Sequence, residues 1–170
     1  NEILKEVQKK TLNKFNLKKI NWIKKFAIKD KNIPSIIFSN EFFDCFPVRQ
    51  FILNKNWYEK YIGYNKENNN LFFKNKILND KKILPLLNLH KKEKFLELSF
   101  ERIKYFKKIC KYIKNNGGLF FTIYYGYFKK ANNFTLQALH NHKYSHVLEN
   151  LGEKDISSHV NFNDLLNIAE

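Results

Sequence analysis

Apolar residues recur at spacings of three and four near the start of the sequence, a spacing that places them on one face of a helix. The pattern predicts an amphipathic helix that ends near Asn16, with an apolar stripe made of Leu4, Val7, Thr11, Leu12 and Phe15. Apolar and polar residues then alternate over residues 19–23, which predicts a short strand.

Two later runs are apolar enough for central strands, at residues 35–39 and 119–125. Such runs are typical of central strands of a parallel sheet, buried on both faces. Between them, residues 95–114 have a helical period, and the helix would bury Ile103, Phe106, Ile109, Cys110 and Ile113. Gly117 and Gly118 would end it before the second strand. A helix, a glycine pair and an apolar strand in this order indicate half of a doubly wound α/β unit.

The remaining segments are less regular. Residues 48–78 contain three aromatic-rich pieces separated by Asn-rich turns, which predicts a small antiparallel insertion with residues 68–70 at a hairpin tip. Residues 128–156 show no clear period, and a short helix is expected over 163–169. With 170 residues and 44% hydrophobic content, one domain is the default expectation.

Polar residues follow the first apolar run directly. Asn40, Glu41 and Asp44 lie among phenylalanines, at the carboxyl end of a predicted parallel strand. Ligands bind at such ends in α/β sheets, so we expect this edge and the edge at residues 124–126 to face one crevice. Two carboxylates three residues apart suit a cation such as a planar guanidinium. The alternative is that Glu41 or Asp44 caps the start of a helix.

Other candidate groups are weaker. His140, His142 and His146 have the short spacing of metal ligands, but no cysteine lies nearby to complete a site. His159 could be a base, a hydrogen-bond donor or a helix cap. Cys45 lies in apolar surroundings, which favour an inert thiol. We therefore expect no metal site.

The formal net charge of +15 raises the question of nucleic-acid binding. Only Arg49 and Arg102 among the 31 basic residues are arginines, and arginine is the side chain that recognises phosphate and bases in two-point fashion. We therefore expect the lysines to be solvated surface and nucleic acid not to be the partner. Two cysteines favour a reducing compartment, and no apolar run approaches the length of about 20 residues that a membrane-spanning helix needs. The chain has no methionine, so we expect it to be part of a longer protein.

Several separated motifs together resemble one family. The segments SNEFFDCFPVRQF, WYE, GGLFFTIYYGY, TLQAL, the single His142 and LGEKDISSHVNF occur in the order and approximate spacing of the MidA-type S-adenosylmethionine-dependent methyltransferases. That family includes the mitochondrial arginine methyltransferase that assists assembly of respiratory complex I. The resemblance covers nearly all 170 residues.

The resemblance implies a fold and a function. The fold would be α/β, a class I methyltransferase (Rossmann-like) parallel sheet, incomplete at the N-terminus, with the antiparallel insertion at 48–78 within a partial methyltransferase domain over 1–170. The expected function is protein-arginine N-methylation with S-adenosylmethionine. The implied substrate is a protein, with a complex I subunit as the candidate, in the mitochondrial matrix or the bacterial cytoplasm. The family's Gly-rich cofactor loop would lie upstream of Asn1.

The resemblance also implies roles for individual residues. Glu41 and Asp44 would be catalytic and clamp the guanidinium, and Asn40 would contact the cofactor. Three later residues would line the acceptor pocket: Gln137, His142 and His159.

The sequence departs from the family at two positions. Tyr124 and Asn161 stand where the family usually has aspartate. Both departures remove negative charge near the expected site. They leave open a catalytically inactive relative that acts as an assembly or binding module.

Overall fold

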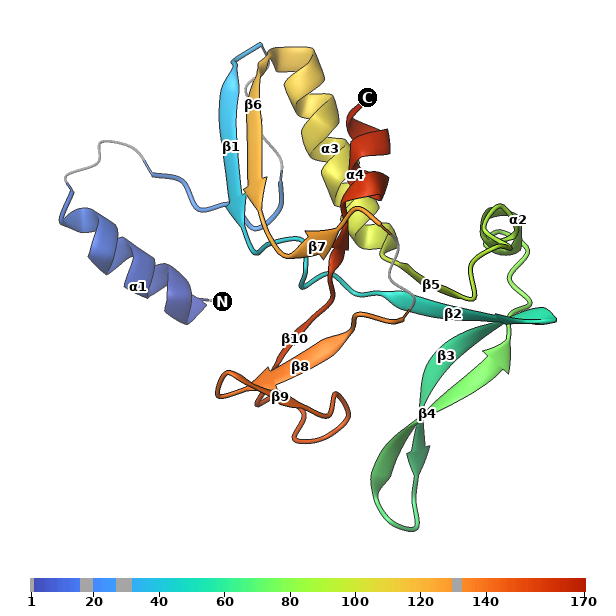
Figure 1. The fold of residues 1–170 in the computed structure, drawn as a ribbon. Coiled ribbons are helices and arrows are strands. Elements are labelled where there is room, and N and C mark those ends of the chain that lie inside the picture. The colour runs from blue at the N-terminus through green and yellow to red at the C-terminus, as the bar shows by residue number, and fades with distance from the viewer. Residues whose placement is uncertain (1, 16–19, 27–31, 130–132) are drawn as a thin grey trace. The chain divides into compact units, whose positions relative to one another are not determined.

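The computed structural model describes residues 2–15, 20–26, 32–129 and 133–170. The chain forms two units, Asn1–Ile33 and Pro34–Glu170, and Figure 1 shows the elements of each. The second unit contains the candidate site.

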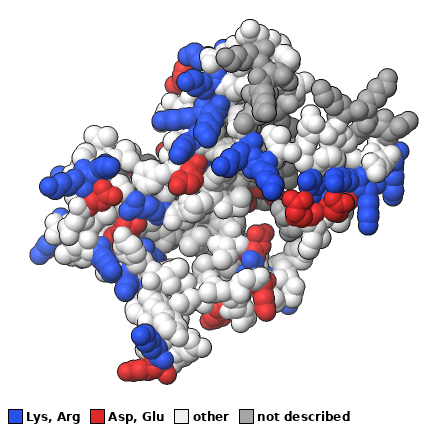
Figure 2. Space-filling view, turned by 180° about the vertical axis from the view of Figure 1, so that it is seen from behind, with Lys and Arg blue, Asp and Glu red and all other residues white. Residues whose placement is uncertain are grey.

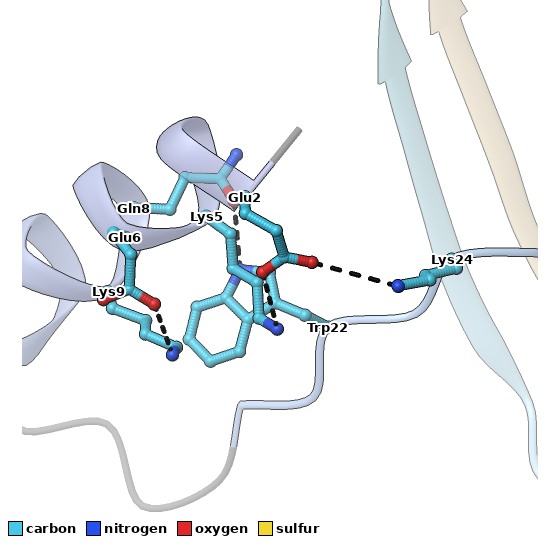
Figure 3. A network of polar contacts seen from close by, with 7 residues as sticks. All are labelled: Glu2, Lys5, Glu6, Gln8, Lys9, Trp22 and Lys24. Carbon is cyan, nitrogen blue, oxygen red and sulfur yellow. Dashed lines mark hydrogen bonds and ion pairs between the residues drawn. The ribbon is translucent and has the colours of Figure 1, made fainter.

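The first unit contains one helix, α1 (Glu2–Asn13), which confirms the predicted amphipathic helix. In Figure 3, Trp22 donates from Nε1 to the side chain of Gln8 at 3.0 Å, and Glu2 lies 3.9 Å from the amine of Lys24. The strand expected over 19–23 is wrong for residues 20–23, which form no strand; Lys19 lies outside the described residues. Trp22 is instead hydrogen-bonded to α1 and does not pair with a strand.

The central feature of the second unit is a parallel strand pair. β1 (Ser35–Asn40) and β6 (Gly118–Ile123) run in register from Ser35 beside Gly118 to Asn40 beside Ile123. This confirms the two predicted strands and their parallel direction. It also brings both carboxyl ends to one edge.

Burial of this pair differs from the expectation. Ile37 and Phe120 are partly buried on the face that α3 covers, whereas Ile36 is 82% exposed and Phe38 62% exposed on the opposite face. The expectation that both faces are buried is therefore wrong within the described part of the second unit. An apolar run indicates that both faces of a strand can be buried, but it does not indicate which segments of the chain cover them.

Helix α3 (Phe100–Asn116) packs on β6 and lies beside α4 (Phe162–Ala169), as Figure 1 shows. Ser99 caps its start by accepting from the Arg102 amide, and Gly117, with φ of 77°, ends it. The expected helix start at residue 95 is wrong. Phe95–Leu98 forms strand β5, because Leu96 enters a neighbouring apolar core and Ser99 offers the helix its cap.

The neighbouring apolar core lies against an antiparallel sheet. Its order is β4-β3-β2-β5, and its new strands are β2 (Arg49–Asn54), β3 (Asn56–Asn65) and β4 (Asn70–Ile77). These strands confirm the three predicted between residues 48 and 78, and Asn69 lies at the hairpin tip with φ of 55°. Helix α2 (Leu84–Asn88) closes one side. The core consists of Phe51, Trp57, Leu78, Ile83, Leu87 and Leu96.

The stretch expected to be irregular, 128–156, contains regular structure. A three-stranded antiparallel sheet forms there from β8 (Gln137–His140), β9 (Lys143–Ser145) and β10 (Asp155–Ser157). The strands are short, so they provide too few residues for a period to be recognised. Beyond them, β11 (Val160–Asn161) pairs in parallel with β7 (Gly126–Tyr127).

Gly126 is required by this close pairing. A Cβ atom there would lie 2.2 Å from the carbonyl oxygen of Val160 and 2.6 Å from the ring of Phe162. We expect Gly126→Ala to lower the free energy of unfolding by about 2 kcal/mol, because backbone must move to relieve the overlap. Gly152→Ala is the control, since that Cβ meets nothing within 4 Å and costs only the strain of φ +89°, about 1 kcal/mol. Urea unfolding of both variants measures the difference, and equal losses would contradict the steric explanation.

Charged side chains are spread over the surface. On the face drawn in Figure 2, Lys and Arg are interspersed with Asp and Glu and do not form one block.

In the described ranges, no helix combines the length and the apolar character that crossing a membrane requires.

Candidate functional site

The candidate site is the turn that follows β1. The Glu41 amide donates to the carbonyl of Ile123 at 2.8 Å, so the turn begins where the two parallel strands end. Glu41 has φ of 45°, which redirects the chain sharply at this point. The two strand ends share one edge, as the parallel register requires, and the crevice that they are expected to face stays a prediction.

Aromatic side chains anchor this turn to the fold. Phe43 is fully buried, and its ring lies 5.7 Å from Phe106 of α3, 6.0 Å from Phe120 of β6 and 5.8 Å from Tyr124. Phe42 packs edge-on against Phe43 at 5.2 Å. These contacts explain why phenylalanines surround the carboxylates: they fix a short segment that has no regular structure of its own.

The two carboxylates have different surroundings. Glu41 is exposed, whereas Asp44 is half-buried, and its Oδ1 is buried without a hydrogen-bond partner among the described residues. No helix begins in this turn, because β2 follows at Arg49, so the capping alternative is wrong. A buried carboxylate oxygen without a partner is unfavourable by itself, which makes Asp44 a candidate for binding a donor from outside the chain.

A second segment, residues 157–161, lies against the turn. The Ser158 amide donates to the Asp44 carbonyl at 3.0 Å, and Ser158 is only 1% exposed. The next residue, His159, is half-buried and donates its amide to the Thr135 hydroxyl at 2.9 Å. Gln137, on β8, donates from Nε2 to the Ser157 hydroxyl at 3.4 Å. Gln137 and His159 are thus on two segments that meet beside Asp44, and their binding roles stay predictions.

His142 has a different setting. It is exposed at the two-residue turn between β8 and β9, where Asn141 has φ of 48° and His142 has φ of 60°. Positive φ at both positions is the geometry of a type I′ hairpin turn. Its role in the acceptor pocket stays a prediction.

We expect His142→Gly to keep or raise thermal stability, because glycine adopts positive φ without a steric penalty. The same variant tests function, since it removes the imidazole and preserves the turn. A fall in kcat/KM with unchanged Tm would support a binding role for His142. Unchanged transfer would identify it as a turn residue, and a lower Tm would contradict the turn assignment.

The remaining histidines do not assemble into a site. His140 Nδ1 lies 2.9 Å from the Glu153 carbonyl, and His146 lies 3.9 Å from the Glu149 carboxylate. Across the described ranges, no group of three His, Cys, Asp or Glu side chains is placed to hold a metal ion. Burial and Asp44 raise the pKa of Cys45, which disfavours its thiolate.

The two departures from the family pattern have structural roles here. Tyr124 stacks on Phe162 with ring centroids 4.9 Å apart, and burial raises its pKa to about 12. The phenol is therefore protonated at neutral pH and fills apolar space. Asn161 is 9% exposed and caps α4 by accepting from the Asn163 amide at 3.1 Å.

Sequence reasoning missed Arg102 and Ser158. Arg102 is only 6% exposed and donates to the Ser158 hydroxyl at 2.7 Å. A signal was present: Arg102 precedes the buried Phe106 and Ile109 by four and seven residues, so it lies on the buried face of α3. A charged residue on an apolar helical face is rarely there unless it is paired.

These features define a class of protein. Parallel strands whose carboxyl ends carry polar groups, with helices packed on one face, are the α/β arrangement of Rossmann-like ligand-binding folds. Two crystal structures from Burkholderia thailandensis share this fold. One contains S-adenosyl-homocysteine and matches with a TM-score of 0.70 and 16% identity over 88% of this chain and 40% of that one. The other, a native structure, matches with a TM-score of 0.72 and 15% identity over 88% and 41%. The fold is that of a class I methyltransferase.

The family follows from the sequence match. Residues 1–170 match the family described as "Putative S-adenosyl-L-methionine-dependent methyltransferase", and the chain belongs to this family. It is also 28% identical over 140 residues to the mitochondrial "Protein arginine methyltransferase NDUFAF7 homolog" of Caenorhabditis elegans. That match covers 80% of this chain and 33% of the relative. The chain thus spans about a third of the curated relative and two fifths of the solved structures.

Proposed function

We propose that this chain forms the acceptor side of an S-adenosylmethionine-dependent protein arginine N-methyltransferase. Membership of the methyltransferase family supports the reaction class. The name of the C. elegans relative supports arginine as the acceptor. In this proposal, Glu41 and Asp44 bind the guanidinium at the carboxyl ends of β1 and β6.

The observation that carries the proposal is the buried, unpartnered Oδ1 of Asp44 in the turn after β1, three residues after the exposed Glu41. A guanidinium has five N–H donors in a fixed plane, so it can bond to the half-buried Asp44 carboxylate while it faces a second carboxylate. Phe43 fixes the turn, so the carboxylate geometry is set before the acceptor arrives.

In this proposal Asn40 contacts the cofactor. It is exposed at the end of β1, where its amide is accessible to a polar ligand. When bound, S-adenosylmethionine supplies a methyl group on positively charged sulfur. The chain's own contribution is to orient one guanidinium nitrogen and localise the positive charge on the other two. The carboxylates can also accept the proton that leaves a guanidinium whose pKa is above about 12.

Labelled methyl transfer by the complete protein tests this function. Two peptides would be compared that differ only in Arg or Lys at one position. We expect label on the arginine peptide and not on the lysine peptide, with methylated arginine identified by mass spectrometry. Label on lysine would contradict the guanidinium proposal, and label on neither peptide would contradict the proposed reaction.

The partner and compartment are also proposals. We infer that the acceptor is a protein, with a respiratory complex I subunit as the candidate that the family resemblance implies. The mitochondrial matrix is the corresponding compartment, supported by the mitochondrial relative, and the bacterial cytoplasm is the alternative. Nucleic acid as a partner would be detected as affinity that falls log-linearly with salt.

One observation favours a second candidate, an inactive binding module. At the end of β6 the phenol of Tyr124 is protonated at neutral pH and cannot replace a carboxylate as an acceptor for positive charge. An inactive module predicts that calorimetry detects S-adenosyl-homocysteine binding by the complete wild-type protein while the wild type transfers no methyl group. Transfer that appears in Tyr124→Asp would identify the residue as the cause.

A further inference from the structure

The strongest unassigned feature is the buried arginine at the first turn of α3. Arg102 is 6% exposed, so it needs partners for its guanidinium. Nη2 donates to the Ser158 hydroxyl at 2.7 Å, and Nη1 donates to the His159 carbonyl at 3.2 Å. Both acceptors belong to the segment that lies against the candidate turn. One side chain of the helix therefore holds two consecutive residues of that segment.

The same segment holds Asp44. The Ser158 amide donates to the Asp44 carbonyl at 3.0 Å, and the Ser158 hydroxyl lies 3.5 Å from that oxygen. The linkage therefore runs from Arg102 through Ser158 to the backbone of Asp44. It fixes the residue in addition to the aromatic contacts of the neighbouring Phe43.

A second support reaches the segment from β5. Glu97 accepts from the Thr135 amide at 3.2 Å, and the Thr135 hydroxyl accepts from the His159 amide at 2.9 Å. Gln50 also donates to Glu97, at 2.7 Å. The backbone of His159 is thus held on its carbonyl side by α3 and on its amide side by β5.

The electrostatic surroundings of Arg102 are consistent with its linkage to Asp44. Two buried side-chain atoms lack a hydrogen-bond partner among the described residues, Nε of Arg102 and Oδ1 of Asp44. They belong to the two ends of the linkage. Burial lowers the pKa of Arg102, and nearby Glu97, Tyr127 and Asp44 act in the opposite direction. The guanidinium therefore lies in the field of the Asp44 carboxylate without being hydrogen-bonded to it.

We propose that Arg102 is a positioning residue, which holds Asp44 in its acceptor-binding place through the Ser158–His159 segment. The inference rests on the proposed role of Asp44. Arg102 does not touch the acceptor; it fixes the backbone that carries the carboxylate. A small displacement of a positioned group can cost up to about a hundredfold in rate.

Arg102→Lys in the complete protein tests the proposal, and Arg49→Lys is its matched control. Lysine keeps the positive charge but cannot donate to both the Ser158 hydroxyl and the His159 carbonyl with one fork. We expect kcat for arginine-peptide methylation to fall about tenfold in Arg102→Lys. The control makes the same change at the chain's other arginine, whose partner Glu59 lies in the antiparallel sheet, and should retain kcat within about twofold.

A double-mutant cycle with Ser158→Ala shows whether the effect passes through Ser158. Positioning through Ser158 predicts that Arg102→Lys with Ser158→Ala loses no more kcat than the stronger single variant. Losses that multiply would overturn the linkage. If the substitutions act only through a general loss of stability, Tm falls in both Arg102→Lys and Arg49→Lys. Arg102→Lys and Ser158→Ala then show no coupling in kcat.

A readout without turnover separates this inference from the proposed function. We expect hydrogen exchange of the Ser158 amide to accelerate about tenfold in Arg102→Lys and to stay unchanged in Arg49→Lys. Unchanged exchange in Arg102→Lys would refute the positioning role even if methylation is confirmed. Faster exchange with no arginine methylation by the wild type would keep the linkage and refute the proposed function.

Discussion

Asp44→Asn and Glu41→Gln, each made in the complete protein, are expected to lower methyl transfer to an arginine peptide by about a hundredfold. Each change keeps the shape of the side chain and removes the negative charge that would localise the guanidinium's charge. The amide also places a donor where the acceptor's own N–H groups need a lone pair. Cofactor affinity should change little, because the proposed cofactor contact is Asn40.

Stability distinguishes this explanation from a structural one. Because Oδ1 of Asp44 is buried without a partner, we expect Asp44→Asn to keep or raise the free energy of unfolding while activity falls. Glu67→Gln is the control for loss of charge alone, since Glu67 is exposed at the distant β3–β4 hairpin. Transfer unchanged in both site variants would show that neither carboxylate binds the acceptor.

The largest expected effect on stability is at the ion pair between the half-buried Arg49 and the buried Glu59 in the antiparallel sheet. Glu59 is 5% exposed and accepts from both Nε and Nη2 of Arg49 at 2.6 Å, and the Tyr61 hydroxyl also donates to it. We expect Arg49→Met to lower the free energy of unfolding by about 3 kcal/mol at pH 7, because it leaves a buried carboxylate without its cation. Urea unfolding measures the loss.

The same pair predicts how stability depends on pH. Hydrogen bonding to Arg49 holds the pKa of Glu59 below its usual value of 4.5. The folded state therefore favours the ionised form of Glu59 more than the unfolded state does. The stabilisation is present above pH 4.5 and is lost as pH falls through the lower pKa of the folded state. We therefore expect the difference in free energy of unfolding between wild type and Arg49→Met to shrink as pH falls below 4.5.

A compensated variant serves as the control for the ion pair. Arg49→Met combined with Glu59→Leu should recover most of the loss, since no buried charge then remains unpaired. If the double variant is as unstable as Arg49→Met alone, packing and not charge explains the loss.

Local patterns predicted most of the elements correctly. The spacing in α1, the apolar runs of β1 and β6 and the turn residues around Gly117 are all short-range signals, and the elements formed where the signals lay. The wrong predictions concern segments whose structure depends on a partner that is distant in the sequence. Residues 95–98 have apolar positions that suit either a helix or a strand, and pairing with β2 made them β5.

The candidate site shows the same division. The position of Asn40, Glu41 and Asp44 at a strand end could be predicted from the apolar run before them. The hydrogen bond that holds the Asp44 backbone could not, because its donor is Ser158, which is more than a hundred residues away along the chain.

Local periodicity and residue types in a fixed order were enough to predict the parallel strand pair, the edge where its polar residues lie and the family to which the motifs point. The inward turn of Arg102 toward Ser158 and the packing of Tyr124 against Phe162 became visible only in the folded chain. The reason is physical: burial and hydrogen bonding depend on which distant segments meet, and no local pattern contains that information.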